Sequence, residues 1–135
     1  MRSKIFRGIA LIVCVATLPG CLLAVGAAGG AGGVIYYKGN LSEYVDYPVS
    51  DIYQATLKVL DKRNMPLYSD VHDNYKAKLS SELNDGKNVW IDIDSVTRES
   101  SEIKIRVGAS GDQKQAVLLL EAIKANLGPK GSNTL

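Results

Sequence analysis

The sequence predicts an α+β fold in which an antiparallel sheet of about four to five strands is covered on one face by two helices, in the order β-α-β-β-β-β-α. Three segments between residues 75 and 107 alternate apolar and polar side chains, which is typical of strands with one buried face. Two further segments have apolar residues at helical spacing. Because a strand with one apolar face must be covered, the two helices are expected to form a second layer on that face.

The first strands are expected between residues 34 and 47. Val34–Tyr37 and Leu41–Tyr47 are rich in Tyr and Val, which favour strands. Gly39-Asn40 between them predicts a turn or a bulge. The folded domain is therefore expected to begin at residue 34.

A helix is predicted to open at Pro48 and Ser50 and to stop near Asn64, because Pro66 disfavours helical geometry at the residue before it. Leu67–Val71 is then predicted to be a short strand. The face of this helix expected to pack on the sheet is formed by Val49, Ile52, Tyr53, Thr56 and Leu60.

The turn Asn84-Asp85-Gly86 decides the register of the next hairpin. A two-residue Asp-Gly loop would place Leu79 opposite Asp92 and mix the two faces of the sheet. A three-residue loop with Gly86 in the left-handed conformation places Leu79 opposite Ile91, so this register is predicted. It also pairs opposite charges across the strands, Lys78 with Asp92 and Lys76 with Asp94.

The last helix is predicted to begin at Asp112, a good N-cap with Gln115 three residues later. Gly128-Pro129 is a stop signal, so the domain is expected to span residues 34–127 and a flexible tail residues 128–135. The apolar face of this helix, expected to pack on the sheet, is formed by Ala116, Leu119, Leu120, Ile123 and Leu127.

Residues 1–20 have the layout of a signal peptide. A basic start is followed by eleven uncharged, mostly apolar residues, Gly8–Leu18, which are too few to span a bilayer. Three of the sixteen basic residues and none of the fourteen acidic ones lie in residues 1–20, so the remainder has a net charge of −1. This balance gives no reason to expect a nucleic-acid partner.

Leu18-Pro19-Gly20-Cys21 resembles the lipobox of bacterial lipoprotein precursors, although Pro19 is unusual at its position. The resemblance implies cleavage after Gly20 and a diacylglycerol thioether on Cys21, which with further acylation such as palmitate would anchor the chain in a membrane. Leu22 is not the Asp that favours inner-membrane retention, so the resemblance implies the outer membrane, facing the periplasm. Without a cysteine after position 21, the domain must be held by its core.

Residues 21–33 are expected to form the lipid-anchored end and an Ala/Gly-rich tether, because Gly-rich segments behave as flexible linkers. An alternative remains. Gly26 with Gly30, and Gly29 with Gly33, form small-xxx-small pairs that let helices pack closely in a membrane.

The chain resembles a family of small bacterial lipoproteins catalogued as a domain of unknown function. Besides the lipobox and the Ala/Gly run, the matching features are short: Tyr36-Tyr37-Lys38-Gly39, Ile52–Thr56, Ile105–Gly108 and Gly111-Asp112. The resemblance implies an envelope lipoprotein and no activity.

Trp90 is the best candidate for contact with a partner. The alternation that buries Val89 and Ile91 turns its indole outward among charged residues, where Arg106 could stack on it. The outward Trp90 and Arg106 thus form either a local brace or a partner-binding patch.

Other candidate sites have simpler structural explanations. Asp92 and Asp94 share a face and could hold a cation, but lysines on the neighbouring strand compensate their charge. Gly108–Gly111 could hold an anion before a helix, but Asp112 would repel it. His72, the single histidine, has no evident catalytic or metal-binding partners.

We therefore expect a non-catalytic binding or structural module with no metal and no cofactor. Its partners would be the membrane, through the lipid on Cys21, and an envelope protein or cell-wall component at the outward sheet face. The alternatives are a periplasmic enzyme with an unrecognised site and a membrane-associated assembly formed through the Gly-rich segment.

Overall fold

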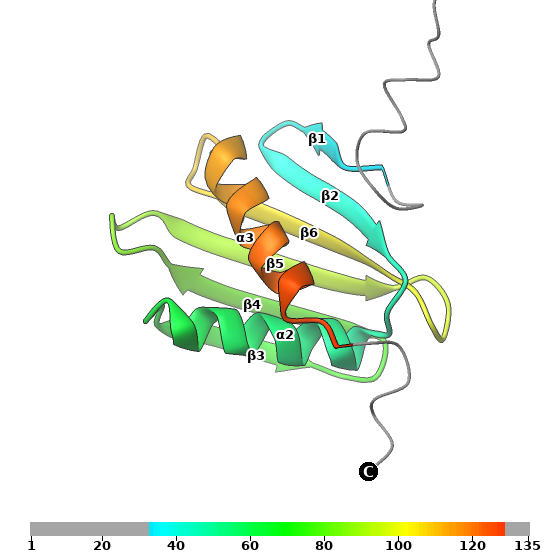
Figure 1. Cartoon of the computed structure of the whole chain (residues 1–135). Helices are drawn as coiled ribbons and strands as arrows, with labels where there is room; N and C mark the ends of the chain where they lie inside the picture. The colour runs from blue at the N-terminus through cyan, green and yellow to red at the C-terminus, as the bar shows by residue number, and fades with distance from the viewer. Residues whose placement is uncertain (1–32, 129–135) are drawn as a thin grey trace, which may run out of the picture. The chain divides into compact units, whose positions relative to one another are not determined.

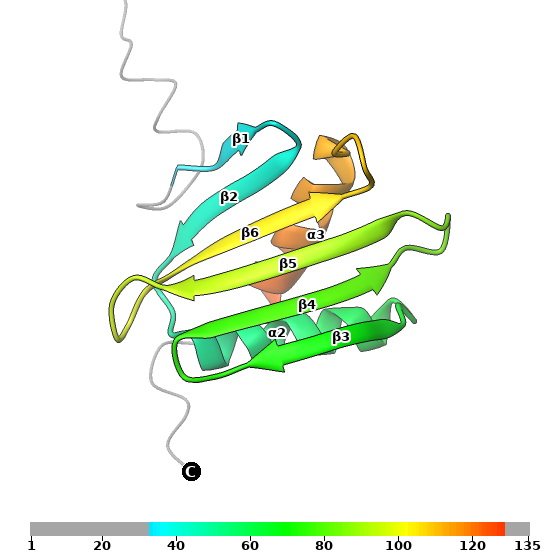
Figure 2. The ribbon, with the colours of Figure 1, turned by 180° about the vertical axis from the view of Figure 1, so that it is seen from behind.

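The computed structural model describes residues 33–128, which form one six-stranded antiparallel sheet with two helices on one face (Figure 1). Seen from behind, residues 33–128 place no helix on the second face of the sheet, which we call the uncovered face (Figure 2). The order across the sheet is β1-β2-β6-β5-β4-β3, so β2 pairs with β6, far away in the sequence. The elements are β1 (Ile35–Tyr37), β2 (Asn40–Val45), α2 (Val49–Lys62), β3 (Leu67–His72), β4 (Lys76–Glu82), β5 (Asn88–Ser95), β6 (Ser101–Val107) and α3 (Gln113–Ala125).

The α+β class and the two covering helices agree with the prediction, but the strand count and the element order were wrong. The segment before α2 forms two strands, β1 and β2, so the order is β-β-α-β-β-β-β-α. Lys38 and Gly39 both have positive φ and form a two-residue turn that pairs Tyr37 with Asn40. Asn40, expected in the turn, is already the first residue of β2.

The register predicted for the β4–β5 hairpin is confirmed. Leu79 lies opposite Ile91 and Lys78 opposite Asp92. Gly86 has φ +84° in a loop closed by a hydrogen bond from its N–H to the Leu83 carbonyl. The three-residue loop therefore keeps the apolar side chains of both strands on one face.

The core lies between this apolar face and the two helices. Each of the strands β2, β4, β5 and β6 contributes alternate buried side chains, as a half-buried sheet requires. The largest fully buried side chains are Leu41, Ile52, Ile91, Ile93, Ile103, Ile105, Leu119, Leu120 and Ile123.

The helix ends follow the expected signals to within a few residues. Helix α2 starts directly after Pro48 and is capped by Arg63, next to the expected end at Asn64. Asp112 caps α3 by accepting a hydrogen bond from the Gln115 N–H, as predicted. Helix α3 ends at Ala125, before the expected stop at Gly128.

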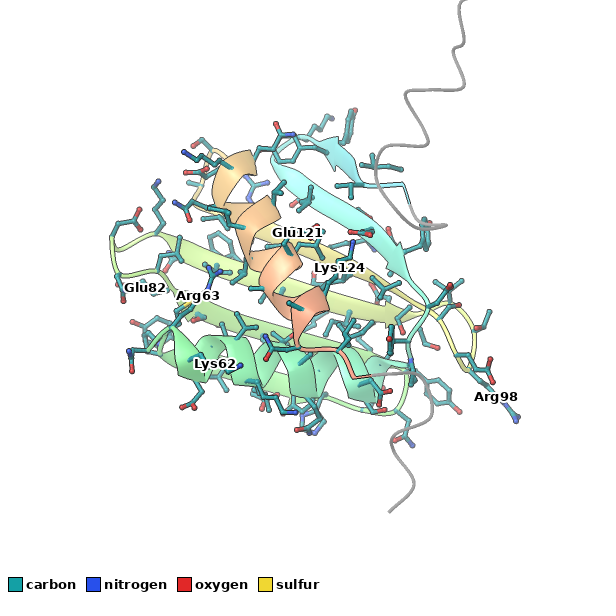
Figure 3. All side chains as sticks on the ribbon, viewed as in Figure 1. Lys62, Arg63, Glu82, Arg98, Glu121 and Lys124 are labelled. Carbon is teal, nitrogen blue, oxygen red and sulfur yellow. The ribbon has the colours of Figure 1, made fainter. Side chains whose placement is uncertain are left out.

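The C-terminal end of α2 is hydrogen-bonded to α3 at two points. The Lys62 ammonium donates to the Asn126 side chain at 2.8 Å, and the Arg63 guanidinium donates to the Leu118 carbonyl at 3.2 Å. Figure 3 shows Lys62 and Arg63 on the side of α2 that faces α3. With both helices fixed on one face, the other face of the sheet is left for contact with solvent or a partner.

Candidate functional site

The uncovered face of the sheet contains an open groove with a volume of about 690 Å³. Its lining comes from all six strands, because residues at alternate positions of each strand point to this face. The lining mixes aromatic, hydroxyl and charged side chains, among them Tyr37, Ser42, Lys78, Trp90, Lys104 and Arg106.

Trp90 lies near the middle of this face, on β5. Its side chain is 39% exposed, and its neighbours across the strands are Ser80 on β4 and Arg106 on β6. A large indole with a small serine on one side has a free surface on which a partner can pack. The outward orientation of Trp90 thus follows from the same alternation that buries Val89 and Ile91.

The Arg106 guanidinium connects two turns of the backbone. Its Nη1 donates to the Lys38 carbonyl at 3.0 Å, and its Nη2 donates to the Ala109 carbonyl. Among the described residues, the cation–π contact is that of Lys38 over the Tyr37 ring, with Nζ 5.3 Å from the centroid. Arg106 therefore holds the β1–β2 turn against the β6–α3 loop, a structural role that the sequence did not reveal.

A network of ion pairs, which we call the charge ladder, crosses the same face. Lys104 lies 3.3 Å from Asp94 and 3.0 Å from Glu102, and Lys76 lies 3.2 Å from Asp94. Ser42 donates a hydrogen bond to Glu102. As expected from the sequence, lysines compensate the charge of Asp94 in the place where a cation would bind.

These contacts change the pKa values of the ladder. Partial burial disfavours ionisation of Asp94, but the hydrogen bonds from Lys76 and Lys104 outweigh it and hold its pKa below the ordinary value. The hydrogen bond from Ser42, with help from Lys104, lowers the pKa of Glu102. Asp94 and Glu102 are therefore ionised at neutral pH.

His72 belongs to a second cluster, between the edge strand β3 and α2. Its Nδ1 lies 3.1 Å from Asp70, and its ring stacks on the Tyr53 ring with centroids 4.2 Å apart. The Tyr53 hydroxyl donates to the other oxygen of Asp70 at 2.6 Å. Burial, together with this hydrogen bond, raises the pKa of Tyr53 to about 12, so the phenol stays protonated and serves as a donor.

The cluster brings one carboxylate to His72. Asp73, next in sequence, instead accepts hydrogen bonds from the backbone N–H groups of Tyr75 and Lys76. Within residues 33–128, no group of three or more His, Cys, Asp and Glu side chains is placed to hold a metal ion. The arrangement joins β3 to α2 through Tyr53, Asp70 and His72.

The Gly108–Gly111 loop is a tight connection held by its own backbone. The Gly111 N–H donates to the Gly108 carbonyl, and the Asp112 N–H donates to the Val107 carbonyl. Lys87 contacts the Asp112 carboxylate at 2.9 Å. The carboxylate at the cap thus occupies the position from which an anion would approach, in agreement with the structural interpretation.

Sequence reasoning missed a partly buried ion pair between β2 and α3. The Lys124 ammonium lies 2.9 Å from the Glu43 carboxylate, which is 5% exposed and faces the core. Figure 3 shows Lys124 on α3 above the sheet. The sequence does contain a sign of this pair. Glu43 lies between Leu41 and Val45, at a position where the alternation of the strand requires an apolar side chain.

The predicted cleavage motif Leu18, Pro19 and Gly20, and the predicted lipidation residue Cys21, lie outside the described residues. So do the proposed tether, except for its last residue, and nearly all of the expected tail. Among the described helices, none is long and apolar enough to cross a membrane.

The comparisons with known proteins identify a family and no activity. No curated protein matches the chain. The family model described as "Protein of unknown function (DUF3568)" matches residues 4–126, which include almost all of the folded domain and most of the segment before it. The expected membership of a family of unknown function is therefore confirmed: the chain belongs to the DUF3568 family.

Proposed function

We propose that this protein is a lipid-anchored lipoprotein of the bacterial cell envelope whose folded domain is a non-catalytic binding module. Cys21 would carry the lipid, and the domain would face the periplasm, with the outer membrane as the favoured location. An envelope protein would bind to the uncovered face of the sheet around Trp90.

The proposed location is supported by the lipobox-like motif and by the extent of the family match. The match begins at residue 4, so it includes the apolar run and Cys21 together with the folded domain. Because Cys21 directly follows the leader and no cysteine comes after it, its thiol would have no partner for a disulfide within the processed chain.

The observation that carries the binding proposal is the exposed indole of Trp90 within the groove. Trp and Arg are enriched in protein interfaces, and the groove contains both, as Trp90 and Arg106. Charges of both signs on the ladder would select a partner with a complementary pattern. We favour a protein partner over a cell-wall glycan because the charged side chains of the ladder can pair with opposite charges on a protein surface.

Lipidation is tested by labelling cells with a palmitate analogue and by mass spectrometry of the processed chain. We expect a labelled product beginning at Cys21, and a Cys21→Ser variant that is neither labelled nor membrane-bound. An unmodified Cys21 thiol in the processed protein would overturn the proposed anchor.

Partner binding is tested by photo-crosslinking in intact cells. A photoreactive residue replacing Ser80, next to Trp90, should give a discrete crosslinked product, whereas the same residue replacing the exposed Leu118 on α3 should not. Adding Trp90→Ala to the protein with the photoreactive residue at position 80 should remove the crosslinked product, because loss of a central Trp contact costs about 2 kcal/mol or more of binding free energy.

Two controls make this result interpretable. Trp90→Ala should change the free energy of unfolding by no more than about 1 kcal/mol, since the side chain is partly exposed. Crosslinked material that disappears on muramidase digestion would identify a cell-wall glycan instead of a protein. Equal products from positions 80 and 118 would contradict binding at the uncovered face.

A further inference from the structure

One edge of the sheet has a cluster of exposed aromatic and aliphatic side chains. We call it the β1 edge and define it by Ile35, Tyr37, Lys38 and Tyr44. Ile35 pairs with Ser42 and Tyr37 with Asn40, so Ile35, Tyr37 and Tyr44 all point to the uncovered face. Each of these three side chains is more than half exposed, and Tyr37 is 67% exposed.

The β1 edge is also where the chain enters the fold. Val34 follows Cys21 by thirteen positions, a segment composed largely of Gly and Ala. A chain of this composition has a typical end-to-end distance of roughly 20 Å. If Cys21 carries lipid, the first residues of β1 are therefore confined to the neighbourhood of the membrane surface.

The chemistry of the β1 edge fits that neighbourhood. Tyr side chains favour the membrane–water interface, where the ring meets the acyl boundary and the hydroxyl stays hydrated. Lys38, whose ammonium lies over the Tyr37 ring, can reach phosphate groups with its charge while its stem lies along apolar surface.

The opposite edge of the sheet provides an internal comparison. Strand β3 and the turn after it also expose large side chains, including Tyr75, which is 74% exposed. They lie at the other end of a six-stranded order, about 24 Å from β1 at the usual spacing between strands. The two edges of the sheet are therefore similar in composition, and the β1 edge differs from the β3 edge because it directly follows the segment that contains Cys21.

We propose that the β1 edge rests in the interfacial region of the membrane that holds the lipid on Cys21, with its tyrosines among the headgroups. This inference depends on the lipid anchor of the proposed function. It orients the sheet with β1 toward the membrane and β3 away from it. The groove around Trp90 then opens sideways along the membrane surface, where a partner in the same membrane can reach it.

The experiment uses the full lipidated chain in phosphatidylcholine–phosphatidylglycerol vesicles that contain brominated lipids, which quench tryptophan only at short range. Trp90→Phe removes the native indole. Tyr37→Trp and Tyr75→Trp are then compared in this background, as matched replacements of exposed tyrosines at opposite edges of the sheet.

We expect several-fold stronger quenching of the Tyr37→Trp protein than of the Tyr75→Trp protein, with the strongest effect from lipids brominated near the headgroup. Equal quenching of both proteins, or stronger quenching at position 75, would overturn the inference. Unfolding midpoints close to that of the Trp90→Phe parent verify that both proteins are folded.

Flotation of the same vesicles separates this inference from the proposal on which it depends. Protein that floats with the vesicles, and is released by Cys21→Ser, but shows no preferential quenching at position 37 retains the anchor and lacks the contact. Protein that remains at the bottom of the gradient has no lipid anchor, and both proposals are then wrong.

Discussion

At the scale of single residues, two glycines far apart in the sequence approach each other too closely for a side chain to fit between them. A Cβ placed on Gly111 would lie 2.2 Å from the Gly39 Cα and 2.7 Å from the Gly39 carbonyl oxygen. The contact is reinforced by the Tyr36 hydroxyl, which donates to the Gly111 carbonyl at 3.0 Å, and by the hydrogen bonds of Arg106 to both segments. The β1–β2 turn is therefore seated directly on the β6–α3 loop.

This contact predicts that Gly111→Ala is much more destabilising than Gly86→Ala. Both glycines have positive φ, so either alanine is strained by about 1–2 kcal/mol. The Cβ at position 86 enters open space, whereas that at position 111 collides with backbone and adds about 1–3 kcal/mol. Urea unfolding of the three proteins measures the difference, and equal losses for both variants would show that the close contact does not exist.

Residue identity alone predicted part of this geometry. Gly86 was assigned its left-handed conformation because the register of the hairpin requires it. The Gly39–Gly111 contact could not be found in this way, since it joins a turn and a loop that only the pairing of β2 with β6 brings together. The same holds for Arg106, for which the sequence suggested stacking on Trp90. Its guanidinium instead donates to the backbone carbonyls of Lys38 and Ala109, which belong to those same two segments, so these acceptors could not be identified from the sequence.

At the scale of elements, the charge ladder joins three strands on the uncovered face. Lys104 on β6 stands between Asp94 on β5 and Glu102 on its own strand, and Glu102 in turn accepts from Ser42 on β2. The hydrogen bond to Glu102 is the main reason that the pKa of Lys104 is raised. Ion pairs at this degree of exposure contribute modestly to stability, and their clearest effect is on its pH dependence.

The ladder predicts a loss of stability in acid that depends on Lys104. The pKa values of Asp94 and Glu102 are lowered in the folded state, so their contribution is complete above the ordinary carboxyl values and disappears as the pH falls through the folded ones. We expect the free energy of unfolding to fall between about pH 5 and pH 3, and to fall less steeply in Lys104→Met.

The matched control is Lys62→Met, because Lys62 donates to the uncharged side chain of Asn126. Its pH profile should run parallel to that of the wild-type protein. Chemical denaturation at each pH gives the free energies directly, and a Lys104→Met profile that is also parallel to wild type would exclude the ion pairs of Lys104 as the source of the acid sensitivity.

The sequence specified some elements better than others, for physical reasons. The β4–β5 register was predictable because a one-residue shift would expose Leu79 and Ile91 and separate lysines from aspartates. The edge strand β3 has no such constraint, as all six of its residues are exposed and its pairing is interrupted between Leu67 and Ser69. The sequence does not distinguish a turn from a bulge between β1 and β2, because Lys38, a non-glycine residue, adopts positive φ there.

At the scale of the whole molecule, the class of the fold followed from amphipathic patterns, but the strand order did not. Local hairpins account for the pairs β1–β2, β3–β4, β4–β5 and β5–β6. The β2–β6 pair instead joins segments about sixty residues apart and connects the β1–β2 hairpin to the rest of the sheet. The partly buried pair of Glu43 and Lys124 lies over this junction and joins β2 to the last helix. A carboxylate retained in the core beside the closing strand is consistent with a role in fixing that arrangement.

The final prediction concerns how the domain is connected to its membrane. If residues 21–33 are a tether, Gly29→Leu with Gly33→Leu leaves the oligomeric state and the folded domain unchanged, because a Cβ on Gly33 meets no atom within 4 Å and linkers tolerate larger side chains. If the segment packs as a membrane helix through small-xxx-small pairs, the two leucines separate the backbones and remove the oligomer, while Gly29→Ala with Gly33→Ala preserves it. Crosslinking in intact envelopes, compared across the three proteins, distinguishes these cases, and we expect all three to behave alike. Loss of oligomers in the leucine variant alone would contradict the tether interpretation. It would indicate that residues 21–33 form an assembly interface and that partner recognition takes place within the membrane.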